Sequence, residues 1–306
     1  MAEIPQDEAP DDRPRPSRLD WGRAQADRAR AKADEAREWA EEARGRSRLM
    51  ALAFDLVERD RNRLGGLLAG ALAYRLFLWL LPFTLFLVGA IGAVTSIDDG
   101  TPNEISTNVG LKGFLGDTLS EGARQRGWWI AMLIGLFAAL YAGMGAVRVL
   151  RISHAAAWGI RPERMRNPLK GSAWLLGIAI GLILAVGLIG WLRHLSFAGG
   201  LITLLAMTAV YFVIWVAGSA RLPHAGVPAR ALMPGALLLA VGVQGLQLFT
   251  AYYLAGRAQR AASLYGTIGA ALALLLWLFI IARLMVGGAI LNAELASAHE
   301  SEDEQA

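Results

Sequence analysis

The stretch SLYGTIGAALALLLWLFIIARLMVGGAILNAEL, residues 263–295, indicates the fold class of this chain. A helix that crosses a bilayer needs ~20 apolar residues, and the uncharged run 261–282 reaches that length. One cation, Arg283, follows this run and precedes further apolar residues. Because a charged side chain in the hydrocarbon region is costly, Arg283 either marks the membrane surface or serves a ligand.

The composition separates the chain into a charged part and an apolar part. The chain of 306 residues is 55% hydrophobic, whereas soluble domains are typically about 45–50% apolar. Residues 1–63 hold much of the charge, and residues 64–295 hold most of the apolar side chains. The absence of cysteine excludes disulfides and thiolate sites. The first sixty residues have no apolar core that would indicate a cleaved signal peptide.

Six apolar stretches are long enough to cross a membrane. They are 76–97 (with a possible extension back to 64), 128–147, 171–192, 195–220, 231–256 and 261–282. We therefore predict an all-α polytopic membrane protein with six transmembrane helices in residues 64–295, preceded by a long N-terminal cytoplasmic helix. An even number of spans places both termini on the same side.

The distribution of lysine and arginine gives the orientation. Thirteen of these residues flank the spans on the side of the termini, in residues 46–63, in the 148–170 loop and at Arg221 and Arg230, against six on the opposite side. Because basic loops stay in the cytoplasm, we expect a multi-pass protein of the cytoplasmic membrane with both termini inside. The net charge of +4 fits anionic lipid headgroups better than nucleic acid.

The parts outside the spans have patterns of their own. Residues 1–18 are rich in Pro, Asp and Arg and are predicted to be disordered. Residues 19–63 have an alanine seam with spacings of 3 and 4, so we predict a charged helix. Its residues 22–57 either lie free in solvent or dock a partner or a second copy of the chain. We expect residues 98–127 to contain a short amphipathic helix and residues 296–306 to form an acidic tail.

Groups for acid–base or metal chemistry are scarce. Between residues 122 and 293 the only carboxylate belongs to Glu163, in a predicted cytoplasmic loop, and the four histidines are dispersed. General acid–base catalysis needs such groups close together, and metal sites need clustered ligands. We therefore expect no enzyme activity, no metal and no cofactor.

Several residues within the spans favour helix packing. GLLAG (66–70) and GIAIG (177–181) are small-xxx-small motifs, which let helices approach closely within one chain or between chains. In a chain with six spans we expect contacts within the chain. Pro82 lies within the first span and is expected to kink it. Gln244 and Gln247 are three residues apart and can join helices by hydrogen bonds.

Arg75 and Arg283 each adjoin an apolar run of 22 residues on the predicted cytoplasmic side. In one interpretation both mark the inner interface and extend to lipid phosphates. In the other, the apolar segments beyond them also lie in the membrane, and no acidic residue within the spans neutralises them. Two such cations would then bind an anion, assisted by Arg148 and Arg151 from the basic loop.

The membrane region, roughly 64–295, contains the motifs AGALAYRLFLWLLPFTLFLVG, MPGALLLAVGVQGLQLFTAYYLAG, SLYGTIGAALALLLWLFI and GAILNAEL. Together these motifs resemble the BrkB/YihY family of bacterial inner-membrane proteins. The residues that match the family motifs are Pro82, Pro234, Gly235, Tyr265, Gly266, Gly269, Trp277, Asn292 and Glu294. The chain departs from the family pattern at Ile290, where a glutamate is common, and at Arg75, where an aromatic residue is common.

The resemblance implies six helices with cytoplasmic termini, which agrees with the span count. Some members carry a ribonuclease label, but this sequence has no His/Asp cluster for such chemistry. We expect the protein to bind or transport a membrane lipid or anionic amphiphile for maintenance of the cell envelope, with Arg75, Arg283, Arg148 and Arg151 as binding residues. The alternative is a membrane scaffold or assembly factor that docks a partner through its N-terminal helix.

Overall fold

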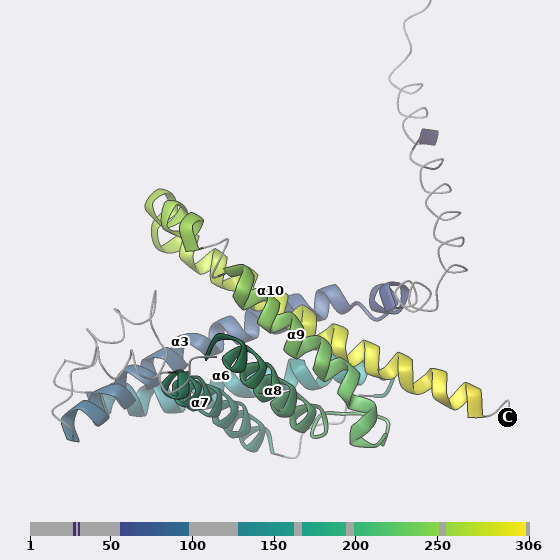
Figure 1. Cartoon of the computed structure of the whole chain (residues 1–306), viewed down its shortest axis with the longest axis horizontal. Helices are drawn as coiled ribbons and strands as arrows, with labels where there is room; N and C mark the ends of the chain where they lie inside the picture. Colours follow the sequence, from purple (N-terminus) through teal and green to yellow (C-terminus); the bar gives the residue numbers. More distant parts are fainter. Residues whose placement is uncertain are drawn as a thin grey trace, which may run out of the picture. The chain divides into compact units, whose positions relative to one another are not determined.

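The computed structural model describes residues 27, 28, 30, 56–97, 128–161, 167–193, 199–250 and 255–303. The chain separates into two compact units, Met1–Asp55 and Leu56–Ala306, and the second contains the long apolar helices. Its elements are α3 (Gly65–Ile97), α6 (Trp128–Ala157), α7 (Pro168–Arg193), α8 (Gly199–Ser219), the 3-10 helix η1 (Ala229–Leu232), α9 (Met233–Phe249) and α10 (Ala255–Asp303), and Figure 1 labels the α-helices. No strand occurs among the described residues.

Six helical segments in the described ranges are long and apolar enough to cross a membrane, which confirms the predicted fold class. They are Gly65–Ala93, Trp128–Ala157, Pro168–Leu188, Gly200–Ser219, Ala229–Phe249 and Ile268–Ala298. The first and last of these segments extend past Arg75 and Arg283. Both arginines therefore lie within long apolar helices and not at their ends.

The outer surface of these helices is apolar. Phe137 keeps 69% of its surface exposed, Leu201 67% and Ile268 71%. Soluble monomers rarely expose large contiguous apolar patches, whereas lipid tails are a suitable environment for such side chains. The exposed apolar residues therefore indicate that these helices lie in a membrane, as their length and hydropathy also do.

Helices α3 and α6 run antiparallel. They pack closely because small residues line their contact. A Cβ on Gly89 would overlap the backbone of Met132, and one on Gly135 would overlap the backbone of Phe86. Buried residues of α6 continue this face at spacings of 3 and 4: Gly135, Ala139, Gly143, Ala146 and Leu150. Glycine and alanine at a membrane helix interface allow the backbones to approach, so these residues set the separation of the two helices.

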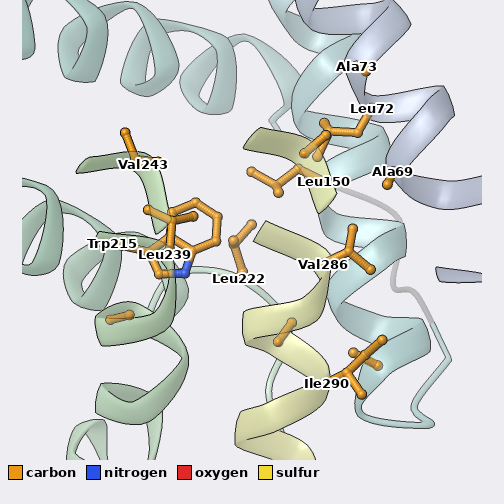
Figure 2. Close-up of a cluster of buried hydrophobic side chains, with 14 residues drawn as sticks. Ala69, Leu72, Ala73, Leu150, Trp215, Leu222, Leu239, Val243, Val286 and Ile290 are labelled. Carbon is orange, nitrogen blue, oxygen red and sulfur yellow. The ribbon is translucent and has the colours of Figure 1, made fainter. Parts of the chain in front are cut away.

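The main buried core joins residues far apart in the sequence. Figure 2 shows Leu72 of α3, Leu150 of α6, Trp215 of α8, Leu239 of α9 and Val286 of α10 within one cluster. Leu72 is 1% exposed and Val286 is 1% exposed. Because five helices contribute to this cluster, it holds the first and last spanning segments together.

Two connecting segments lie side by side at one end of the helices. Helix α6 ends at Ala157, and the turn after it contains Gly159, which has a φ of 67°. Ile160 N donates a hydrogen bond to Ala155 O at 3.0 Å. This is a common way to end a helix with glycine. A Cβ on Gly159 would lie 2.8 Å from a guanidinium nitrogen of Arg63. The segment that precedes α3 therefore lies beside the turn that follows α6.

The entry into α3 contains a strained residue. Residues 56–62 are helical, and a turn at residues 63 and 64 separates them from α3. Leu64 has a φ of 55°, a left-handed conformation that costs a non-glycine residue roughly 1–2 kcal/mol. This turn sets the direction of residues 56–62 relative to α3.

Two expectations about helix packing meet different outcomes. Gly66, Gly70, Gly177 and Gly181 have no described atom within 4 Å of a Cβ built on them. The prediction that GLLAG and GIAIG bring helices of this chain together is therefore wrong within the described residues, since their glycines face outward. The glutamine prediction is confirmed for Gln247, whose Nε2 donates to Tyr211 Oη at 2.6 Å and joins α9 to α8.

Some predictions fall on residues that the structure does not describe. These are the disordered tail 1–18, all but a few residues of the alanine-seam helix 19–63 with its partner surface 22–57, and the external loop 98–127. The acidic segment 296–306 is helical as far as Asp303, because α10 continues through it.

Candidate functional site

The start of α9 is fastened to α10 by one amide side chain. Asn292 Oδ1 accepts a hydrogen bond from Gly235 N at 2.7 Å, and Asn292 Nδ2 donates to Leu232 O at 3.1 Å. Asn292 is 2% exposed. Pro234 occupies the first turn of α9, where its missing N–H leaves no donor unsatisfied. The Pro234–Gly235 and Asn292 motifs therefore meet in space and form a joint between two helices.

Close backbone contact makes this joint possible. A Cβ on Gly235 would overlap Gly288 O, and a Cβ on Gly288 would lie 2.8 Å from Gly235 O. Ile290, at the position where the family pattern often has glutamate, is 1% exposed and belongs to the main core cluster. A buried carboxylate there would need a partner, and isoleucine packs without one.

Two consecutive residues, Arg59 and Asp60, each form an ion pair with a side chain of α10. Arg59 Nη1 donates to Glu294 Oε2, and it lies 3.4 Å from Ser297 Oγ. The side chains of Arg59 and Glu294 are 24% and 22% exposed. The motif residue Glu294 therefore holds the helical segment 56–62 against the C-terminal half of α10.

Arg283 has an acidic partner in the chain. Its Nη1 and Nη2 donate to the two carboxylate oxygens of Asp60 at 2.6 and 2.7 Å. Gly65 permits this arrangement, because a Cβ there would overlap Asp60. The expectation that Arg283 must find its counter-ion outside the chain is therefore wrong. The spans themselves hold no carboxylate near it, but Asp60 precedes the first span and reaches Arg283 from there.

Arg75 occupies a different environment. It is exposed, and its Nη1 would lie 3.1 Å from a Cβ on Gly145, so its side chain runs along α6. Among the described residues no carboxylate pairs with it. The described residues line three cavities, and none of these three is lined by both Arg75 and Arg283.

The first cavity lies beside the Asp60–Arg283 pair. It has a volume of about 370 Å³, and its lining includes Leu56 and Val57 before α3, Leu238 of α9 and Phe279 of α10. Since Arg283 already binds a carboxylate bidentately, its guanidinium is not a free anion site in this conformation.

The second cavity lies among all six spanning helices and is called the central cavity here. Its volume is about 330 Å³. One lining residue from each helix in turn is Leu76, Val147, Ile178, Ile214, Val243 and Trp277. Tyr211 and Gln247 are polar lining residues, and they bond to one another. The central cavity is therefore suited to an apolar ligand.

The third cavity, called the basic pocket here, has a volume of about 340 Å³. Its lining residues are Val147, Arg151, Asn167, Lys170, Gly171, Trp174, Arg221 and Leu222. Of the predicted binding residues it contains Arg151 but not Arg148, which is exposed on α6. Lys170 and Arg221 were not predicted as binding residues, although both count among the basic residues that set the predicted orientation.

The remaining motif residues have structural positions. Helix α3 continues through Pro82, and Thr84 Oγ1 donates to Leu81 O at 2.7 Å. Tyr265, Gly266 and Gly269 lie in α10. Within the described ranges, no three His, Cys, Asp or Glu side chains come close enough together to hold a metal ion.

Comparison with known proteins identifies the family. The family model described as Virulence factor BrkB matches residues 57–306. No curated protein and no solved structure matches the chain. The match begins at the segment held to α10 by Arg59 and Asp60, and it includes every helix of the membrane region. This chain belongs to the Virulence factor BrkB family.

Proposed function

We propose that this membrane protein binds or transports a lipid or another anionic amphiphile within the bilayer. The observation that supports the proposal is the central cavity, which all six spanning helices line. Small-molecule sites are typically concave, mostly apolar and about 300–1,000 Å³ in volume. A cavity of about 330 Å³ is large enough for an apolar chain, and lipids are the most abundant apolar molecules around a membrane helix.

The position of the cavity favours a ligand over simple packing. Membrane helices gain stability from close contact, and the glycines between α3 and α6 provide such contact. The central cavity interrupts this packing between aromatic side chains such as Trp174, Tyr211 and Trp277. A void in a protein interior loses the dispersion contacts of its lining atoms, and an acyl chain would restore them.

We further propose a role without a chemical step. The described lining of the central cavity contains no carboxylate and no histidine, so the two kinds of side chain that most often act as general acids and bases are not placed where the ligand would lie. Membrane orientation is part of the same proposal: the protein lies in the cytoplasmic membrane with both termini inside. The arginines that favour this orientation, such as Arg63, Arg151 and Arg221, belong to connecting segments or helix ends.

Filling the central cavity tests this function. Ile178→Trp on α7 places a larger side chain in the lining, and Leu184→Trp is the matched control, because Leu184 on the same helix is 63% exposed. We expect Ile178→Trp to lower the amount of anionic lipid that stays bound through purification several-fold, and Leu184→Trp to leave it unchanged. Bound lipid is measured by mass spectrometry of the intact protein.

Folding must be checked in the same experiment, because overpacking typically costs about 1–3 kcal/mol. Thermal unfolding in detergent identifies a variant that has lost its fold, and Ala179→Leu then provides a milder filling of the same cavity. If folded variants with a filled cavity retain as much lipid as the unaltered protein, the central cavity is not the binding site. If the unaltered protein retains none, the proposed function is wrong.

A further inference from the structure

Three cations converge on the basic pocket from three different elements. Arg151 lies in the last two turns of α6, Lys170 in the first turn of α7, and Arg221 in the turn after α8. The described lining of the pocket includes no carboxylate. Three like charges around one cavity repel one another, so this arrangement is most stable with an anion between them.

The Arg221 side chain contacts neutral groups. Arg221 Nη1 donates to Ala217 O at 3.2 Å, and its guanidinium carbon lies 5.9 Å from the ring centroid of Trp174. Asn167 Oδ1 accepts a hydrogen bond from the backbone N of Lys170 at 3.2 Å. Because a guanidinium has five N–H donors, Arg221 keeps donors for a ligand while Ala217 and Trp174 hold its position.

The basic pocket and the central cavity share part of their lining. Val147 of α6 and Trp174 of α7 line both. An anion held by Arg151, Lys170 and Arg221 would therefore lie next to an apolar space surrounded by six helices. This juxtaposition of charge and apolar volume fits one molecule with an anionic head and an apolar chain.

We propose that the basic pocket binds a phosphate monoester, which is the headgroup of an amphiphile whose chain enters the central cavity. A phosphate monoester carries about −1.5 to −2 charges at neutral pH and three acceptor oxygens, whereas a phosphodiester or a carboxylate carries one charge. Three converging cations complement the monoester best. This proposal rests on the proposed function, and it names the ligand class and the residues that recognise it.

The site differs from the one that the sequence indicates. Arg283 is paired with Asp60, and Arg75, whose side chain lies beside Gly145 of α6, is not among the lining residues of the basic pocket. Only Arg151 belongs both to the predicted binding residues and to this pocket. The headgroup is therefore held by Arg151, Lys170 and Arg221, which are neighbours in space only.

Two probes with the same chain and different heads test the proposal. The probes are 1-oleoyl lysophosphatidic acid, a phosphate monoester, and 1-oleoyl lysophosphatidylglycerol, a phosphodiester, each titrated into the full-length protein in a neutral detergent. We expect the monoester to bind at least tenfold more tightly. This tenfold preference corresponds to about 1.4 kcal/mol, and it is expected because the monoester brings more negative charge to the same three cations.

A pair of triple variants separates the pocket from general surface charge. The variant Arg151→Gln/Lys170→Gln/Arg221→Gln removes the cations of the basic pocket, and Arg148→Gln/Arg161→Gln/Arg230→Gln removes three exposed charges outside it. We expect the first variant to lose the preference for the monoester and the second to keep it. Equal loss in both, with both folded by thermal unfolding, would overturn the proposal.

The remaining outcomes distinguish the headgroup from the chain. Inorganic phosphate alone should compete only weakly, and competition as strong as that of lysophosphatidic acid would assign the pocket to free phosphate and overturn the amphiphile. If both lysolipids bind equally and Ile178→Trp weakens both, the headgroup proposal fails and the proposed function stands. If neither lysolipid binds, both fail.

Discussion

Asn292 Oδ1 accepts a hydrogen bond from Gly235 N at 2.7 Å across 57 residues of sequence. This bond satisfies a backbone donor at the first turn of α9, where no carbonyl of the same helix is available. The same amide donates to Leu232 O, just before α9. One buried side chain thus fixes both the start of α9 and its position against α10.

Removal of this amide should destabilise the membrane domain. Asn292→Ala leaves Gly235 N and Leu232 O without their partner, and an unsatisfied buried group costs about 1–3 kcal/mol. We expect a lower midpoint of thermal unfolding in detergent, followed by circular dichroism. Leu276→Ala, at an exposed position on the same helix, should stay within about 0.5 kcal/mol of the unaltered protein. Equal midpoints for both variants would contradict this account of the joint.

Two glycine substitutions should differ in their effect on stability, although each adds a single methyl group. Gly235→Ala forces a Cβ into Gly288 O, whereas a Cβ on Gly177 meets no described atom within 4 Å. We expect Gly235→Ala to lower the unfolding midpoint and Gly177→Ala to leave it unchanged or raise it, because alanine favours a helix by about 1 kcal/mol over glycine. The comparison needs only thermal unfolding of the two purified variants, and a larger loss from Gly177→Ala would refute the observed packing.

The pair between Asp60 and Arg283 should be energetically coupled. In a double-mutant cycle with Asp60→Asn and Arg283→Gln, we expect the double variant to lose less stability than the two single variants together. Contacting residues show couplings of about 0.5–3 kcal/mol. We expect the lower half of that range, because the Arg283 side chain is 40% exposed and solvent screens the pair.

Exchange of the two charges is a stricter test of the same pair. Asp60→Arg/Arg283→Asp keeps one cation and one anion in contact, so it should recover part of the stability that Asp60→Arg alone loses. Gly65→Ala should lower stability without any change of charge, because its Cβ would overlap Asp60. If the stability losses of the two single variants add exactly in the double variant, and the charge exchange recovers no stability, the pair contributes nothing to the stability of the protein.

The proposed orientation can be measured because the chain contains no cysteine. A single cysteine at Arg126, just before α6, should react with an impermeant maleimide in intact cells. One at Arg161, just after α6, should react only after permeabilisation, because basic loops remain inside. The reverse pattern would place both termini outside, and reaction of both positions in intact cells would contradict the crossing of α6.

The sequence alone determines the six spans and the helical class, because length and hydropathy are local properties of the chain. It also indicates the family, since the MPGAL and LNAE motifs are short and contiguous. The sequence does not tell which face of a helix carries a small-residue motif. Spacing in GLLAG and GIAIG suggested internal contacts, yet the close contacts lie at Gly89, Gly135 and Gly235.

Charge pairing was decided by the tertiary structure. Arg283 looks unpaired in the sequence because its partner Asp60 lies 223 residues earlier, outside the predicted spans. The basic pocket is similar, because Arg151, Lys170 and Arg221 are dispersed in the sequence and converge only when α6, α7 and the turn after α8 pack. Hydropathy sets where a helix begins and ends, whereas the neighbour of a long charged side chain depends on how all the helices pack together.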